Sequence, residues 1–161
     1  NMVELVDKLS ANPNLLPCTA AEQISLDRLR DREKQRTARD IMVPMKTIPW
    51  DGSVQHAAAL ITEGRDNMAA VLSEDGILAG VLTAWDLARA VGRGGVCREL
   101  QIEDIMSREV VSAAPDERLS DVVRKLEQYR ISALPVAQDG SVLGLVTSDI
   151  LLGELGAILA E

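Results

Sequence analysis

Two related stretches decide the fold: Gly80-Val81-Leu82-Thr83-Ala84-Trp85-Asp86 and Gly144-Leu145-Val146-Thr147-Ser148-Asp149. Each has the pattern of an apolar strand that runs into a helix, because a Thr hydroxyl is well suited to the first position before a helix. Around these stretches the chain matches itself at an offset of 64 or 65 positions, so that Asp40-Ile41-Met42 corresponds to Asp104-Ile105-Met106. We therefore predict two copies of one unit, which together fill the chain from about residue 37 onward.

Within each unit the pattern predicts the order β-α-β-β-α. Short extended segments at 45–49 and 110–114 come first, and each precedes a helix whose apolar residues recur at i, i+3, i+4 and i+7. Two strands joined by an Asp-Gly turn follow, which is the signature of a hairpin. The predicted hairpin strands are Met68–Leu72 with Ile77–Leu82, and Ala133–Ala137 with Ser141–Val146. One unit alone buries little apolar surface, so we expect an α+β fold in which the two repeats pack as a pseudo-twofold pair.

The first 36 residues have a different pattern and no counterpart in the repeats. Their apolar spacing predicts two helices, broken at Asn12-Pro13-Asn14, and the second helix becomes rich in alternating charges. A solvated helix with ion pairs, a linker that relays a signal, and a basic strip for phosphates all fit this segment. We expect three parts, namely a helical lead or linker at 1–36, a first repeat at 37–97 and a second at 98–161.

Composition excludes several classes of function. The 161 residues carry 17 Lys+Arg and 25 Asp+Glu, a net charge of −8, and only 2% are aromatic. An acidic chain with so few aromatic rings is a poor candidate for nucleic-acid binding. No apolar stretch approaches the roughly 20 residues needed to span a bilayer. Two Cys and one His leave no metal site and no nucleophile–base pair, so we expect a cytoplasmic protein that is not an enzyme.

The repeats resemble cystathionine-β-synthase (CBS) domains, arranged as the tandem pair called a Bateman module. The first family motif is an apolar residue, Ser or Thr, two residues and Pro, which Val111-Ser112-Ala113-Ala114-Pro115 satisfies; the equivalent Lys46-Thr47-Ile48-Pro49-Trp50 has Trp where Pro is expected. The second motif ends in Ser or Thr, two residues and Asp. Gly80–Asp86 satisfies it, whereas Gly144–Asp149 has one residue fewer between Thr and Asp.

This resemblance implies a regulatory module, commonly a homodimer, that binds an adenosine-containing ligand between its repeats and alters an attached or partner protein. A module of this kind is expected to require no cofactor and no metal. The residues that the resemblance assigns to the ligand are Thr47, Ile48, Ala69, Ala70, Thr83, Asp86, Ser112, Leu134, Pro135, Thr147 and Asp149. Plain burial in the strands would equally explain the apolar members of this set.

The second motif has a physical basis. A Thr at a strand-to-helix junction places its hydroxyl beside the free N–H groups of the first helical turn, where an oxyanion is favoured. An Asp three residues later lies on the same face and can accept hydrogen bonds from both ribose hydroxyls. Asp149 follows Thr147 by only two residues, which rotates it by about 100°. We therefore expect the first-repeat cleft to bind ligand and the second to be the degenerate one.

The residues before the two motif aspartates, Trp85 and Ser148, are uncharged, and residues 131–161 contain no Lys or Arg. We accordingly expect AMP, adenosine or S-adenosylmethionine to bind in preference to ATP. The alternative function is a structural dimerisation or interaction module whose clefts bind nothing.

Overall fold

The computed structural model describes residues 36–64, 66–94 and 99–159, and Thr37–Glu161 form one unit. The helices predicted for the N-terminal lead fall on residues that lie outside this description. The repeat boundaries at 36/37 and 97/98 stay predictions. None of the helices described has both the length and the apolar character needed to cross a membrane.

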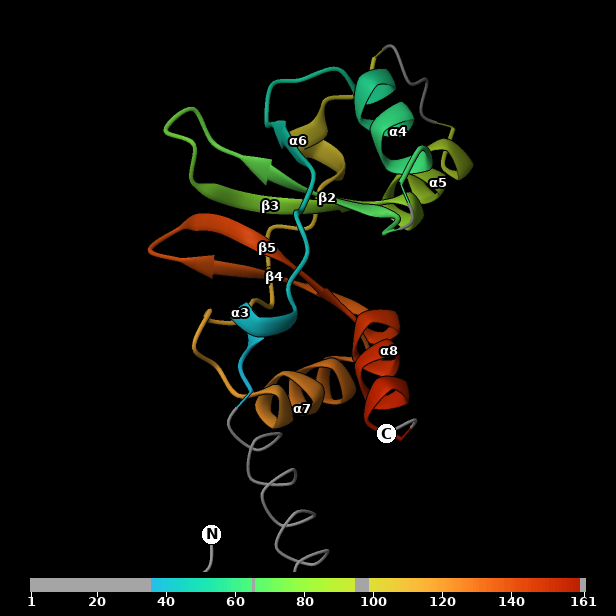
Figure 1. The fold of residues 1–161 in the computed structure, drawn as a ribbon. Helices are drawn as coiled ribbons and strands as arrows, with labels where there is room; N and C mark the ends of the chain where they lie inside the picture. The colour runs from blue at the N-terminus through green and yellow to red at the C-terminus, as the bar shows by residue number, and fades with distance from the viewer. Residues whose placement is uncertain (1–35, 65, 95–98, 160–161) are drawn as a thin grey trace, which may run out of the picture. The chain divides into compact units, whose positions relative to one another are not determined.

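The first repeat is built on a three-stranded sheet (Figure 1). Its elements are β1 (Thr47–Pro49), α4 (Val54–Thr62), β2 (Met68–Leu72), β3 (Leu78–Thr83) and α5 (Ala84–Gly92). β1 pairs with β2 in parallel, and β2 pairs with β3 in the antiparallel register of a hairpin. The order β-α-β-β-α and the extent of β2 confirm the prediction for this repeat.

The second repeat contains α7 (Leu119–Tyr129), β4 (Ala133–Gln138), β5 (Ser141–Thr147) and α8 (Ser148–Leu159). Its sheet has two strands, because the extended segment predicted at 110–114 is reduced to a single bridge between Ala113 and Val136. The flanking backbone groups bind side chains instead: the Ser112 carbonyl accepts from Lys125 Nζ at 2.8 Å, and the Ala114 N–H donates to Glu117 Oε2 at 3.1 Å. These side-chain bonds replace the ladder on either side of the bridge.

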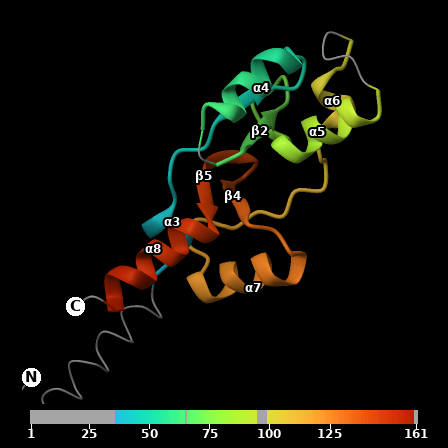
Figure 2. The same ribbon diagram turned by 90° about the vertical axis from the view of Figure 1, so that its right-hand side faces the viewer.

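Each repeat receives a short helix from the chain segment that precedes the other repeat's first strand. Two helices are involved, α3 (Ala38–Ile41) and α6 (Ile102–Ile105). α3 contributes Ala38 and Ile41 to the core of the second repeat, whereas α6 contributes Ile102 to the core of the first. α3 lies beside the hairpin β4–β5 (Figure 1), and α6 lies beside α5 (Figure 2). The two repeats therefore complete one another's cores.

Backbone pairing follows the exchanged helices across the repeats. Val43, just after α3, exchanges two hydrogen bonds with Leu145 of β5, at 2.8 and 3.0 Å. Ser107, just after α6, does the same with Val81 of β3, with both bonds at 2.9 Å. Gly144 lies beside the first of these pairs, where a Cβ would come within 2.8 Å of the Val43 carbonyl oxygen. These paired contacts join the two repeats at equivalent places, as the pseudo-twofold prediction requires.

Candidate functional site

Both motif threonines cap a helix, as predicted from the sequence. The Thr83 hydroxyl accepts a hydrogen bond from the Asp86 N–H at 3.2 Å, and the Thr147 hydroxyl accepts one from the Ile150 N–H at 3.2 Å. In both cases the donor is the third residue of the helix, which is the usual geometry of a side-chain N-cap. That third position holds an Asp in α5 and an Ile in α8, so the two junctions present different side chains.

Asp86 is committed to its own helix. It is only 4% exposed, and its Oδ2 accepts from the Thr83 N–H at 3.0 Å and from the Thr83 hydroxyl at 2.6 Å. Its Oδ1 accepts from Nη2 of Arg89, one turn further along α5. This is a reciprocal capping box extended by an ion pair. A ribose diol that used Asp86 would have to compete with these three donors.

Asp149 has the opposite environment. It occupies the second position of α8, one residue earlier than Asp86 in α5, because the second motif is one residue shorter. The rotation of about 100° per residue turns its side chain away from the capping position. Asp149 is exposed, and within the described residues its carboxylate has no hydrogen-bond or ion-pair partner. It is therefore the motif carboxylate that is available to another molecule.

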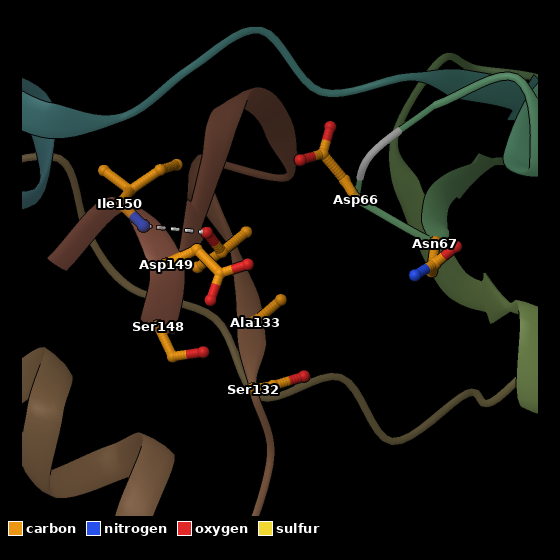
Figure 3. Close-up of a pocket in the computed structure, with 8 residues that line it drawn as sticks. Asp66, Asn67, Ser132, Ala133, Ser148, Asp149 and Ile150 are labelled. Atoms are coloured by element: carbon orange, nitrogen blue, oxygen red, sulfur yellow. Dashed lines mark hydrogen bonds between the residues drawn. The ribbon is translucent and has the colours of Figure 1, made fainter. Parts of the chain in front are cut away.

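A cavity of about 360 Å³ lies at this junction, between the two repeats. Figure 3 shows Asp66 and Asn67 facing, across the gap, Ser132 and the start of α8. The described residues that line it are Asp66, Asn67, Ser132, Ala133, Thr147, Ser148, Asp149 and Ile150. Both predicted residues of the second motif, Thr147 and Asp149, are therefore together in one pocket.

Six lining residues were missed from the sequence, namely Asp66, Asn67, Ser132, Ala133, Ser148 and Ile150. Asn67 and Ser132 occupy equivalent places, each immediately before the first strand of its hairpin. Each carbonyl accepts a hydrogen bond from the first N–H of the helix that follows the hairpin, at 2.9 Å for Asn67 and 2.8 Å for Ser132. The predicted hairpins held this signal, because in an antiparallel pair the start of one strand lies beside the end of the other.

A second cavity, of about 460 Å³, lies between α5 and α6. Its lining carries charges of both signs, from Asp86 and Asp104 and from Arg89 and Arg93. Apolar residues of the α6 region, such as Met106, complete it. The buried carboxylate of the first motif therefore borders a different pocket from the one that contains Asp149.

The remaining predicted residues are in the sheets, except Ser112, which lies next to the single bridge of Ala113. Ile48, Ala69, Ala70, Leu134 and Pro135 are buried, and none of them is among the described lining of these two cavities.

Some backbone groups of the predicted strand residues already form hydrogen bonds to neighbouring strands or segments. The Ala70 N–H donates to the Lys46 carbonyl at 2.8 Å, and the Pro135 carbonyl accepts from the Ala113 N–H at 2.9 Å. Thr47 pairs with Ala70 in the parallel register. A ligand role for these residues, and for Thr83 and Ser112, stays a prediction.

Trp85 marks a further difference between the two junctions. It is the second residue of α5 and so corresponds in helix position to Asp149 in α8. Its side chain is 72% exposed. An aromatic ring therefore stands at one junction where a carboxylate stands at the other.

The CBS domain family model matches residues 38–93 and 102–157, which are the two repeats. Among solved structures, the CBS domain pair of protein MJ0100, crystallised with 5′-methylthioadenosine and S-adenosyl-L-methionine, is 32% identical with a TM-score of 0.69. The match covers 76% of this chain and 97% of that one. The CBS domain of a membrane protein from Sphaerobacter thermophilus is 26% identical over 83% of this chain and 96% of its own, with a TM-score of 0.68.

Curated relatives are longer proteins. A Methanosarcina acetivorans protein named L-aspartate semialdehyde sulfurtransferase is 38% identical over 69% of this chain, and a Methanosphaerula palustris protein named homoserine O-acetyltransferase is 35% identical over 78%. This chain spans only 22% and 24% of those two proteins. The two matched repeats, their exchanged helices and the agreement with solved CBS domain pairs establish that the chain belongs to the CBS domain family.

Proposed function

We propose that this CBS domain pair is a regulatory module that binds an adenosine-type ligand in the inter-repeat pocket around Asp149. The observation that carries the proposal is the unpaired carboxylate of Asp149, held at the N-terminus of α8 inside a cavity of about 360 Å³. An ionised carboxylate can accept hydrogen bonds from both hydroxyls of a ribose. The cavity volume lies within the range of about 300–1,000 Å³ that is usual for small-molecule sites.

The neighbouring structures support the class of ligand. The CBS domain pair of MJ0100 was crystallised with two adenosine derivatives, and this chain covers 97% of it. We propose that AMP, adenosine or S-adenosylmethionine binds here in preference to ATP. The described lining of the pocket offers no Lys or Arg to pair with a polyphosphate.

Coupling to another protein would follow from the position of the pocket. Asp66 and Asn67 come from the first repeat, and Ser148 and Asp149 come from the second. A ligand that contacts both sides can shift the repeats only by binding one arrangement better than another. The output would pass to an attached or partner protein, and the module itself would perform no catalysis.

Calorimetry on the full chain tests this function. We expect 5′-methylthioadenosine or adenosine to bind with a stoichiometry of one per pocket, and Asp149→Ala to weaken binding at least tenfold. Asp139→Asn is the matched control, because Asp139 is exposed in the β4–β5 turn, and Asn tolerates its φ of 51°. Full retention of affinity in Asp149→Ala would remove the proposed role of this pocket.

A structural dimerisation module is the second candidate, and a specific surface favours it. An apolar groove of about 370 Å³ lies between α7 and α8. Its described lining is Val123, Leu126, Glu127, Ile131, Ser148, Leu151 and Leu152. Light scattering that gave a dimer mass, together with no heat on addition of any adenosine derivative, would support this function over ligand sensing.

A further inference from the structure

The cavity of about 460 Å³ between α5 and α6 is separate from the Asp149 pocket, because the described linings of the two share no residue. Its floor is apolar. Met106 belongs to the core of the first repeat, and Leu100 and Ile105 pack against that core. The volume is within the range of about 300–1,000 Å³ that is usual for small-molecule sites. The cavity is therefore a second candidate site, with an apolar base and room for a small molecule.

Arg89 brings a positioned guanidinium to one wall of this cavity. Its Nη2 donates to Oδ1 of Asp86, and that carboxylate is only 4% exposed and also accepts two hydrogen bonds from Thr83. In the part of the chain that the structure describes, the other N–H groups of this guanidinium donate to no side chain or backbone group. A guanidinium oriented by a buried carboxylate has less freedom to lose when it binds an anion.

Two further charges of opposite sign line the cavity from different helices. Arg93 follows the last residue of α5, one turn after Arg89, and Asp104 lies on α6. Within the described residues neither of these two side chains has an ion pair or a hydrogen bond. α5 and α6 are neighbours (Figure 2), yet these opposite charges do not pair across the space between them. One wall therefore carries positive charge and the other carries negative charge.

The balance of these charges decides the class of ligand. Two arginines and two aspartates line the cavity, so the lining has no net charge. Asp104 would repel a simple anion, and Arg89 and Arg93 would repel a simple cation. A molecule with one charge of each sign avoids both conflicts, and an apolar group on it would cover the floor. An α-amino acid with an apolar side chain combines these three features.

We propose that the α5–α6 cavity is a second binding site, which takes an α-amino acid with an apolar side chain. The carboxylate of the ligand lies against Arg93 and the positioned guanidinium of Arg89, and its ammonium group lies against Asp104. Its side chain rests on the apolar floor. This site goes beyond the function proposed above and does not depend on it.

Calorimetric titration of the full chain with L-valine, L-leucine and L-methionine tests the site. We expect at least one of them to bind with a Kd of about 1 mM or below, which is reasonable for so small a ligand. The tightest of the three is then compared with the matching amine and the matching carboxylic acid, which for L-leucine are isopentylamine and 4-methylpentanoate. Each of these analogues lacks one charge and should bind at least tenfold more weakly than the amino acid.

Two isosteric or near-isosteric variants connect each charge of the ligand to one wall. Arg93→Gln should weaken binding of the amino acid at least threefold and reduce its advantage over the amine. Asp104→Asn should weaken it at least tenfold and abolish its advantage over the carboxylic acid. Both residues are exposed, so both variants should fold. Arg124→Gln on α7 and Asp139→Asn in the β4–β5 turn change the same charges outside the cavity and should leave binding unchanged.

The results also separate this site from the Asp149 pocket. Arg93→Gln and Asp104→Asn should leave binding of 5′-methylthioadenosine unchanged, and Asp149→Ala should leave binding of the amino acid unchanged. If none of the three amino acids bound, or if the tightest bound equally well to both charge variants, the proposal would be overturned, whatever the adenosine derivatives did. Tighter binding of the carboxylic acid than of the amino acid would also overturn it, because the cavity would then be a site for anions.

Discussion

Replacing Asp86 by Ala should destabilise the fold, whereas the same change at Asp149 should not. Asp86 is 4% exposed and accepts three hydrogen bonds, from the Thr83 N–H, the Thr83 hydroxyl and Arg89. Asp149 is exposed and has no partner within the described residues. The two motif aspartates are therefore expected to divide the work, with one holding a helix in place and the other available for ligand.

The expected cost at Asp86 is the sum of three contributions. Loss of the reciprocal side of the capping box costs about 1 kcal/mol. The Thr83 donors left without a partner in a partly buried position add about 1 kcal/mol. The ion pair adds about 0.5 kcal/mol, because Arg89 is 44% exposed and solvent weakens it. The free energy of unfolding should therefore fall by about 2–3 kcal/mol.

Urea and thermal unfolding followed by circular dichroism measure this difference. Asp86→Ala should lower Tm by about 5–10 °C, at the 2–4 °C per kcal/mol usual for a chain of this size. Asp149→Ala should stay within about 0.5 kcal/mol of the parent chain, as exposed substitutions usually do. Equal losses in the two variants, or a loss below about 0.5 kcal/mol for Asp86→Ala, would refute the division of roles described above.

Three further changes test separate parts of the structure. Arg89→Gln removes the ion pair of α5 and should lower Tm by about 1–2 °C; Arg124→Gln, which breaks a more exposed ion pair one turn apart on α7, should have a smaller effect in the same thermal scan. Gly144→Ala should cost about 1–3 kcal/mol in urea unfolding, because its Cβ would meet a carbonyl oxygen at 2.8 Å. Gly153→Ala in α8 meets nothing within 4 Å and should stabilise by about 0.5–1 kcal/mol, so equal effects of the two Ala variants would contradict the packing described. We also propose that this face of α8 is a dimer contact: Leu152→Asp, at a side chain 65% exposed, should lower the mass of the chain in light scattering, and a parent chain that is already a monomer, or an unchanged mass, would contradict this contact.

The features that could be predicted from sequence are those with local signals. The Thr that ends β3 and the Thr that ends β5 were predicted as helix caps, and both accept a hydrogen bond from the third residue of their helix. The hairpins are predicted from two apolar segments joined by an Asp-Gly turn, and β2 has the predicted bounds. Such signals depend on only a few neighbouring residues, so they can be recognised without knowing how the rest of the chain folds.

The exchange of α3 and α6 could not be predicted in the same way. Each is a four-residue helix with two apolar residues, and neither Ala38–Ile41 nor Ile102–Ile105 contains a signal for the repeat against which it packs. That choice depends on which core has an unfilled face once both sheets have formed. The pseudo-twofold pattern predicted that the repeats pack together, but not which segments cross over.

The candidate site falls between these two cases. The rotation of Asp149 relative to Asp86 follows from a one-residue difference in spacing and was predicted. The effect on the site could not be predicted, because it depends on side chains from other parts of the fold. Thr83 and Arg89 donate to the buried carboxylate of Asp86. Asp66 lies across the cavity from the exposed carboxylate of Asp149. Whether the first-repeat cleft or the second binds ligand stays a prediction, and the contrast between these carboxylates supports the second.

The exchanged helices also constrain how the protein is made. The backbone hydrogen bonds between Val43 and Leu145 cannot form until Leu145 leaves the ribosome, about a hundred residues after Val43. Until then α3 has no core to pack against, whereas α6 can join the first repeat as soon as residue 107 has been made. The second repeat should therefore fold last, so the pocket around Asp149, which both repeats line, forms only when synthesis of the pair is almost finished.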